Sequence, residues 1–348
     1  MTTNPQSLPY RVLAVPDLRA EAAYFGVALP VLPDFLQDHT LLGTSPAEKL
    51  AEVLGRFERL VIGLRKYRGT AYTLRYLSRP QDGAVDIHLL GRFLPPPGQS
   101  LTDVERVAVD LEKHLTSYGL PHSRLNGAEL DAALRPFSSL PYLVEVRQQE
   151  TRIPLAITQQ TAYVIFPFWG PWGAGLEPME ALLRQETPVA ISIYLEPLDD
   201  ISAELALVDE AAHSAQTLSD QDIKVMSDTG LRRRRDPGAE LVGRVYTAYR
   251  KSLSEPFLAV AQVASADSSA ALTLARAFGS ALTSRPPRDS TEPVDDLPSG
   301  FDLCAPRDKA EYDCAWRTFD RLVWSRWGST LATPGKERLP YLVGARGA

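Results

Sequence analysis

Two glycine-containing stretches come nearest to a phosphate-binding loop, and neither has the required spacing. Residues 166–175 (FPFWGPWGAG) contain Gly170, Gly173 and Gly175 in the order G-x-x-G-x-G, which is not the dinucleotide fingerprint. Residues 328–337 (GSTLATPGKE) place six residues before Gly-Lys, where a P-loop has four, and end in Glu337 instead of a magnesium-binding Ser or Thr. The sequence therefore predicts that this chain binds no nucleotide cofactor and hydrolyses no ATP.

The residue types that bind metals or act as nucleophiles also lack a suitable pattern. None of the five histidines has an H-x-x-E-H or C-x-x-C context, so each is most simply a surface or partly packed residue. They are His39, His88, His114, His122 and His213. Serines are plentiful, but G-x-S-x-G does not occur. We therefore expect no metal, no cofactor and no enzymatic activity, although one alternative stays open: a hydrolase-like enzyme, for instance one using His88 and Asp86, whose residues converge only in the fold.

The strongest local charge is the run LRRRRDPG, which contains Arg232, Arg233, Arg234 and Arg235. Four consecutive arginines cannot all lie on one helix face, so the simplest prediction is a solvated loop. The alternative is a contact to phosphate or to an acidic partner surface. The net charge of −6 favours the loop.

The bulk composition is that of an ordinary globular protein with more than one domain. The chain has 348 residues, of which 44% are hydrophobic, and its mixed charges give no overall attraction to nucleic acid or to an anionic membrane. Nucleic-acid binding at a local patch therefore stays open. The start, MTTNPQSLPYRV, does not read as a secretion signal, and no stretch reaches the ~18 apolar residues of a membrane span. We predict a cytoplasmic protein with Cys304 and Cys314 reduced.

The first part of the chain predicts a helix, a hairpin and a second helix. Residues 45–69 have an N-cap serine, a proline at the first helical position and a glutamate that completes a capping box. Two alternating runs, 71–77 and 84–93, predict a β-hairpin in which Tyr72, Leu74 and Tyr76 lie opposite Val85, Ile87 and Leu89. Residues 102–119 predict the second helix.

The remainder alternates between strands and helices, which predicts an α/β or α+β fold with a mixed sheet and helices packed on it. The expected strands are 142–149, 161–168, 188–197 and 257–265. We predict the following organisation: an α+β domain at 1–135, a mixed α/β domain at 136–283, a Pro-rich linker at 284–300 and a C-terminal helix and tail at 301–348.

Large aromatic residues mark two further places. The C-terminal helix is expected over about 308–327, with Tyr312, Trp316, Phe319, Val323 and Trp327 on one stripe. After the strand at 161–168, the prolines and glycines of 166–175 take the chain out of the sheet, so its two tryptophans lie on a loop. The candidate interface residues are Trp169, Trp172, Trp324 and Trp327; we expect Trp169 to be core and Trp172 to be an anchor.

The order of these segments resembles the N-terminal, non-motor region of the HerA and VirB-type bacterial ATP-binding proteins of the FtsK–HerA group. The segments are LRYLSRPQDGAVDIHLLGRF, TAYVIFPF, PVAISIYLEP, EPFLAVAQVAS, WRTFDRLVWSRWGSTL and KERLPYLVGA. The resemblance covers most of residues 60–345 and rests on short phrases and apolar patterns.

The resemblance implies an α/β accessory domain that assembles or docks an ATPase motor, with self-association possible, and it assigns no catalytic residue to this chain. In that group a motor domain follows the segment similar to RLPYLVGA, whereas this sequence ends at Ala348. We therefore expect the motor to be missing from the chain or supplied by a separate polypeptide. The predicted function is a non-enzymatic assembly or docking module for a ring-forming DNA- or protein-translocating ATPase.

Overall fold

The described strands of the chain form one large antiparallel sheet and one separate hairpin. The computed structural model describes residues 10–15, 20–30, 55–56, 58–81, 83–168, 181–221, 223–227, 230–283, 297–328 and 337–345. The main path of the sheet is β1 (Arg11–Val15), β2 (Ala20–Ala28), β4 (Ala84–Phe93), β3 (Thr70–Arg79), β8 (Val189–Pro197), β11 (Phe257–Ser265), β6 (Tyr142–Pro154) and β12 (Phe301–Cys304). Three short partners join this path: β5 (Ser123–Arg124) on β2, β7 (Thr161–Phe166) on β6 and β13 (Leu342–Val343) on β11.

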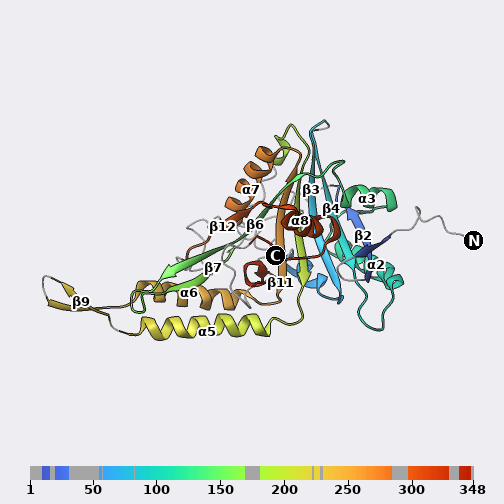
Figure 1. Cartoon of the computed structure of the whole chain (residues 1–348). Coiled ribbons are helices and arrows are strands. Elements are labelled where there is room, and N and C mark those ends of the chain that lie inside the picture. Colours follow the sequence, from blue (N-terminus) through green and yellow to red (C-terminus); the bar gives the residue numbers. More distant parts are fainter. Residues whose placement is uncertain are drawn as a thin grey trace, which may run out of the picture.

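Helices cover both faces of this sheet (Figure 1). On one face, α2 (Val104–Ser117) and the helical residues 58–64 pack on β2, β3 and β4, and α7 (Ser268–Leu282) packs on β6, β8 and β11. The opposite face is covered by α3 (Gly127–Leu134) and α8 (Lys309–Arg321). The structure is thus α/β in content, with helices on both sides of an antiparallel sheet.

Strand alternation explains how one sheet supports two cores. In β6, Val144 packs with α7, whereas its neighbour Leu143 packs with α8. The same alternation separates Val263 from Ala264 in β11. Successive side chains of a strand point to opposite faces, so apolar residues at consecutive positions predict a strand buried on both sides.

The prediction of a mixed sheet is wrong for the described strands, because every pairing among them is antiparallel. The connection from β8 to β11 shows the reason. A single crossover helix would carry the chain to the opposite end of the sheet and give a parallel neighbour. Here α5 (Ser202–Ser219) leads out and α6 (Pro237–Ser252) leads back, so Phe257 pairs with Pro197 at the end where β8 stopped.

The predicted domain boundary at residues 135 and 136 falls between α3 and β6. Strands from both sides of it are hydrogen-bonded neighbours, as the pairing of Tyr72 in β3 with Leu195 in β8 shows. The segments 1–135 and 136–283 therefore contribute to the same sheet. Of the predicted linker 284–300, only its last four residues belong to the described chain, and Leu297 among them is buried.

The C-terminal helix is shorter than predicted. Helix α8 ends at Arg321, because Leu322 adopts a left-handed conformation (φ 50°) and the following residues are not helical. This conformation is unusual for a residue other than glycine, but it lets Leu322 and Val323 enter the core that covers β2 and β11. The tryptophans after this point therefore do not continue the aromatic stripe of the helix.

Candidate functional site

The longest helices extend from the sheet as an arm, which we define as α5, α6 and the hairpin between them. The two helices contact each other through small and apolar residues, and Gly243 lies where an added Cβ would be 3.7 Å from the Cβ of Ala215. At its base the arm packs against β7 and the C-terminal segment through Tyr246 and Tyr249. Figure 1 shows the arm below the sheet, with the hairpin at its far end. The arm therefore carries the hairpin away from the body of the protein.

The hairpin at the end of the arm consists of β9 (Ile223–Ser227) and β10 (Gly230–Arg234), which we call the ribbon. The strands are antiparallel, with Arg233 opposite Lys224 and Arg232 opposite Val225. The prediction of a loop is thus wrong for Arg232, Arg233 and Arg234, which lie in a strand. Arg235 follows the strand and is exposed. Pairing with β9 gives part of the run the backbone hydrogen-bond partners that define a strand.

A buried aspartate fixes the point at which the chain returns from the ribbon to the arm. Asp236 caps α6: its Oδ1 accepts from the backbone N of Gly238 at 3.0 Å and of Ala239 at 3.2 Å. Its Oδ2 accepts from the backbone N of Ile157, in the turn between β6 and β7, at 3.0 Å. Burial alone would raise the pKa of this carboxyl, but the backbone donors hold the pKa below its ordinary value. One side chain thus joins the base of the ribbon to the sheet.

Replacing Asp236 with alanine is expected to lower the free energy of unfolding by ~2 kcal/mol at neutral pH, since a cap and a further buried donor lose their acceptor. The folded carboxyl has the lower pKa, so its contribution is present above the unfolded value and is lost as pH falls through the folded one. The difference in free energy of unfolding between wild type and D236A should therefore become smaller between neutral pH and about pH 3. Urea unfolding at both pH values measures this, and an advantage that grows on acidification would contradict it.

The C-terminal segment is held by the arm and the sheet together. The Tyr249 hydroxyl of α6 lies 2.5 Å from the carbonyl oxygen of Leu339 and 3.1 Å from that of Leu342. On α5, the Glu204 carboxylate forms an ion pair with Arg338 at 2.8 Å. These contacts fix residues 338–342 to the base of the arm, so the arm and this end of the described chain form one packed unit.

A buried charged network lies under the same segment. Glu145 and Arg147 of β6 are both almost fully buried and form an ion pair. The Glu145 carboxylate also accepts from Trp327 Nε1 and from the Tyr341 hydroxyl, each at 3.1 Å. The Arg147 guanidinium lies 4.5 Å from the centre of the Trp327 ring. These contacts satisfy the buried carboxylate and hold the two aromatic residues against the sheet.

The four tryptophans predicted as interface residues have different positions. Trp169 and Trp172 lie outside the described residues. Trp327 is only 5% exposed, so burial in the network explains it without a partner. Trp324 is half-buried and meets the Tyr341 ring edge-on, with their centres 5.5 Å apart. Neither described tryptophan projects from the surface as an anchor would.

Exposed apolar side chains occur instead at one end of the sheet, which we call the sheet end. Leu140 and Tyr142, at the start of β6, are 71% and 58% exposed. Tyr142 pairs with Ser265 at the end of β11, and Ser265 pairs with Val189 at the start of β8, so these residues share one end of three adjacent strands. Leu183, six residues before Val189, is 51% exposed. A cavity of about 300 Å³ lies at the neighbouring end of β3, lined in part by Pro136 and Pro188.

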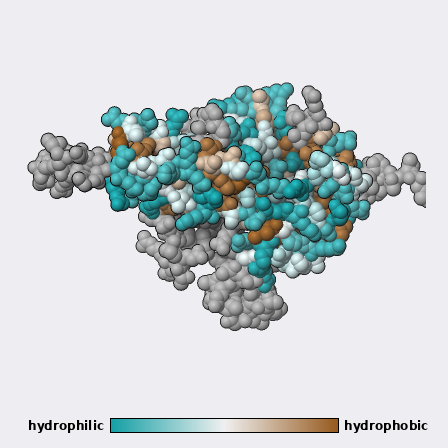
Figure 2. All heavy atoms as spheres, turned by 90° about the horizontal axis from the view of Figure 1, so that it is seen from below, coloured by the Kyte–Doolittle hydropathy of each residue, from teal (hydrophilic) through white to brown (hydrophobic). Residues whose placement is uncertain are grey.

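Figure 2 shows the protein from below the view of Figure 1, and this face has no comparable group of exposed apolar side chains among the described residues. On that face hydrophobic side chains form small patches separated by hydrophilic ones, which is typical of a surface in contact with water.

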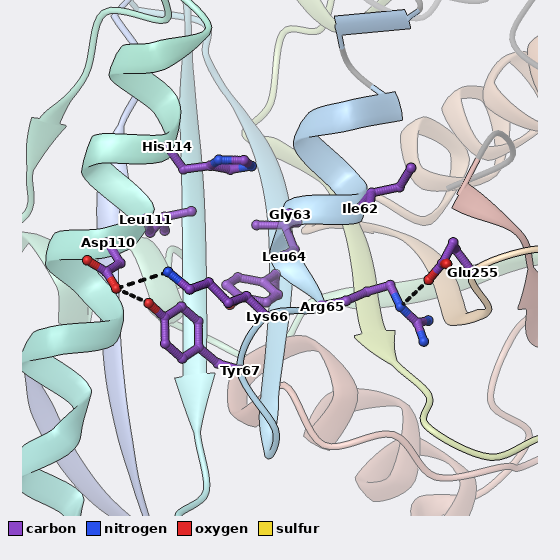
Figure 3. A pocket seen from close by; sticks show the side chains of 11 residues that line it. Ile62, Gly63, Leu64, Arg65, Lys66, Tyr67, Asp110, Leu111, His114 and Glu255 are labelled. Atoms are coloured by element: carbon purple, nitrogen blue, oxygen red, sulfur yellow. Dashed lines mark hydrogen bonds and ion pairs between the residues drawn. The ribbon is translucent and has the colours of Figure 1, made fainter.

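A second cavity, of about 390 Å³, lies between α2 and the helical residues 58–64, with Tyr72 of β3 also in its wall (Figure 3). Lys66 and Tyr67 both point toward Asp110, which accepts a hydrogen bond from the tyrosine and forms an ion pair with Lys66 at 3.4 Å. The Tyr67 hydrogen bond lowers the pKa of Asp110, while burial and the same bond raise the pKa of Tyr67. The carboxylate therefore stays ionised and the phenol protonated at neutral pH. Such a group can bind a polar ligand or simply tie the two helices together.

The pair named for the enzyme alternative does not form a catalytic arrangement. Asp86 is ion-paired with Arg79 at 2.9 Å. Burial lowers the pKa of His88, and its Nδ1 is buried without a hydrogen-bond partner. His114 lies in the wall of the second cavity, where its Nε2 is 3.2 Å from the Leu60 carbonyl oxygen, and His39 lies outside the described residues.

Within the described ranges, no group of histidine, cysteine, aspartate and glutamate is arranged to hold a metal ion, and no helix is long and apolar enough to cross a membrane. Cys304 and Cys314 are both free, as predicted. Comparison with known protein families and with curated proteins finds no match to this chain.

Sequence reasoning missed Asp236 and the sheet end. A signal for Asp236 was present, since an aspartate directly before a proline is typical of a helix start. The sheet end had no such signal, because Tyr142 and Val189 come to the same end of the sheet only through the pairing of β6, β11 and β8.

Proposed function

We propose that the chain is a non-enzymatic assembly module that docks onto a ring-forming bacterial translocation ATPase in the cytoplasm. The exposed apolar side chains at the sheet end are the observation on which this proposal depends. Tyr142 begins β6 and Leu140 precedes it by two residues, and both are largely exposed although the next six residues of the strand, 143–148, are buried. Exposed apolar residues gathered at one place mark a protein interface more often than a monomer surface.

The partner that we propose is the motor domain, and the resemblance to the N-terminal region of HerA and VirB-type proteins supports this choice. The same proposal includes the finer organisation: a helix–hairpin–helix unit in 1–135, a second unit in 136–283 and a C-terminal aromatic helix that connects them to the motor. Self-association through the same surface would assemble several copies around a ring.

The test compares a variant and a control for binding to a purified motor domain of a HerA- or VirB-type ATPase. Changing Leu140 and Tyr142 to serine should weaken binding at least ~10-fold, because their apolar area would no longer be buried, while leaving folding within about 0.5 kcal/mol. The matched control changes Val12, which is 43% exposed on the edge strand β1. Biolayer interferometry gives the affinities, and sedimentation gives the self-association of each variant.

Equal affinities for wild type and both variants would contradict the docking proposal. The second cavity favours one other function, a hydrolase-like enzyme, because Lys66, Tyr67 and Asp110 converge there. An intrinsic hydrolytic activity that is lost in Asp110→Asn would support that function instead.

A further inference from the structure

The second cavity, between α2 and the helical residues 58–64, has the features of a ligand site. We infer that it binds a small organic carboxylate, with the apolar body of the ligand inside the cavity and its carboxylate at Lys66. The ligand class follows from the shape of the cavity, from the hydrogen bonds already present in its wall and from the charges at its mouth. The inference does not depend on the docking proposal, because the sheet end is formed by other elements, β6, β8 and β11.

The cavity lies between two contacts that join the helices. At one of them the His114 imidazole lies so close to Gly63 that an added Cβ would overlap its Nε2, so glycine leaves the room that the ring needs. At the other, Lys66 and Tyr67 reach Asp110 (Figure 3). The space of about 390 Å³ is large enough for a small molecule, because ligand pockets have volumes from about 300 Å³ upward.

Apolar residues form the inner part of the wall. Leu64, Tyr72 and Leu111 line the cavity and are buried, and Ile62 in the same wall is 37% exposed. Apolar surface of this kind favours a ligand whose own apolar atoms replace the water in the cavity. An inorganic anion such as phosphate would leave the same surface in contact with water. The ligand therefore has an apolar body.

The acceptors along one side of the wall already have donors. The carbonyl oxygens of Ile62 and Gly63 accept from the backbone N of Arg65 and Lys66, at 3.1 and 3.3 Å. The Glu255 carboxylate forms an ion pair with the Arg65 side chain at 2.8 Å. A ligand that mainly donates hydrogen bonds, such as an amine, would compete with these donors. The wall therefore favours a ligand that accepts hydrogen bonds.

The polar group at the mouth has a donor to spare, the ammonium of Lys66. An ammonium has several N–H donors, and among the described residues the ion pair of Lys66 is the one with Asp110, at 3.4 Å. The same carboxylate accepts from Tyr67 and lies 3.5 Å from the Nζ of Lys113, so two lysines share one negative charge. The mouth therefore suits an anion. The Lys66 side chain is 66% exposed, so a carboxylate bound there stays partly hydrated and avoids the cost of full burial.

The test measures binding of phenylbutyrate to the full chain by a saturation-transfer NMR titration at neutral pH. We expect saturable binding with a dissociation constant of about 1 mM or lower. The uncharged amide, phenylbutyramide, should bind at least ~5-fold more weakly, because it offers no charged acceptor to Lys66. Inorganic phosphate should also bind at least ~5-fold more weakly, because it has no apolar body to fill the cavity.

Variants assign the binding to the cavity. Lys66→Met should weaken phenylbutyrate binding at least ~5-fold and leave phenylbutyramide binding within about twofold, whereas Lys66→Arg, which keeps the charge, should retain the affinity for phenylbutyrate. The matched control is Arg106→Met, which removes an exposed charge from α2 outside the cavity wall and should change the affinity by less than about twofold. Ile62→Trp places a larger side chain in the wall and should abolish binding of both ligands. Circular dichroism checks that all variants are folded.

Four results would overturn the inference. They are no saturable binding of phenylbutyrate by the wild type, binding of the amide or of phosphate as tight as that of phenylbutyrate, equal losses in Lys66→Met and Arg106→Met, and unchanged binding in Ile62→Trp. Binding of the carboxylate that is lost in Lys66→Met and kept in Arg106→Met supports it. This result is independent of motor binding, so failure of the docking proposal and failure of the carboxylate site are distinguishable.

Discussion

Replacing Arg75 with methionine is expected to lower the free energy of unfolding by at least ~3 kcal/mol, because several buried acceptors lose their donor at once. Arg75 is fully buried in β3. Its Nη1 donates to the carbonyl oxygens of Ala133 and Leu134 at 2.6 and 2.8 Å, and its Nη2 donates to the carbonyl of Phe319. The guanidinium thus donates hydrogen bonds to the C-terminal ends of both α3 and α8, where both helix dipoles favour a positive charge.

Burial lowers the pKa of Arg75 to about 9. This value is still above neutral pH, so the guanidinium stays charged and needs these carbonyl oxygens as acceptors. The matched control is Arg79→Met on the same strand. Arg79 is half-exposed and ion-paired with Asp86, so its loss should cost under ~1 kcal/mol. Urea denaturation followed by circular dichroism compares the two variants. Similar small losses at both positions would mean that Arg75 does not join the two helices to the sheet.

Replacing Trp327 with alanine should cost ~3–5 kcal/mol of folding stability, as expected for a large aromatic residue removed from a core. The substitution would leave a cavity beside Ala315 and Phe319 and remove the ring next to the Arg147 guanidinium. It would also remove the indole donor to the buried Glu145 carboxylate. Thermal unfolding measures the loss.

The milder change Trp327→Phe separates packing from hydrogen bonding. Phenylalanine keeps an aromatic ring in this position but cannot donate to Glu145, so the expected cost is about 1–3 kcal/mol. Self-association, measured by sedimentation, should not change in either variant that remains folded. A nearly unchanged melting temperature together with weaker association would show instead that Trp327 is an interface anchor, the role predicted from sequence.

Much of the secondary structure could be predicted because it depends on residues close together in the chain. The strand predicted at 257–265 coincides with β11, and the one predicted at 188–197 with β8 within one residue. The periods of 2 and 3.6 residues and the caps are local properties that hold before any tertiary contact forms.

The candidate site was less predictable, for two different reasons. The arginine run was identified by its charge, but its strand conformation depends on pairing with β9, which no feature of the run itself indicates. Trp327 was assigned to a helix stripe and to an interface, whereas its position follows from the end of α8 at Leu322 and from Glu145, which lies far away in sequence.

The sequence by itself determined many of the helices and strands, such as β8 and β11, and where the basic charge lies in the chain. The tertiary structure decided the antiparallel order of the strands, because α5 and α6 return the chain to the end of β8 at which it left. It also decided where charge is buried: Arg75 and Glu145 lie inside because acceptors and donors from distant segments, such as Ala133 for Arg75 and Trp327 and Tyr341 for Glu145, satisfy them. Polar groups enter a core only when distant residues satisfy their hydrogen bonds, and local sequence does not contain that information.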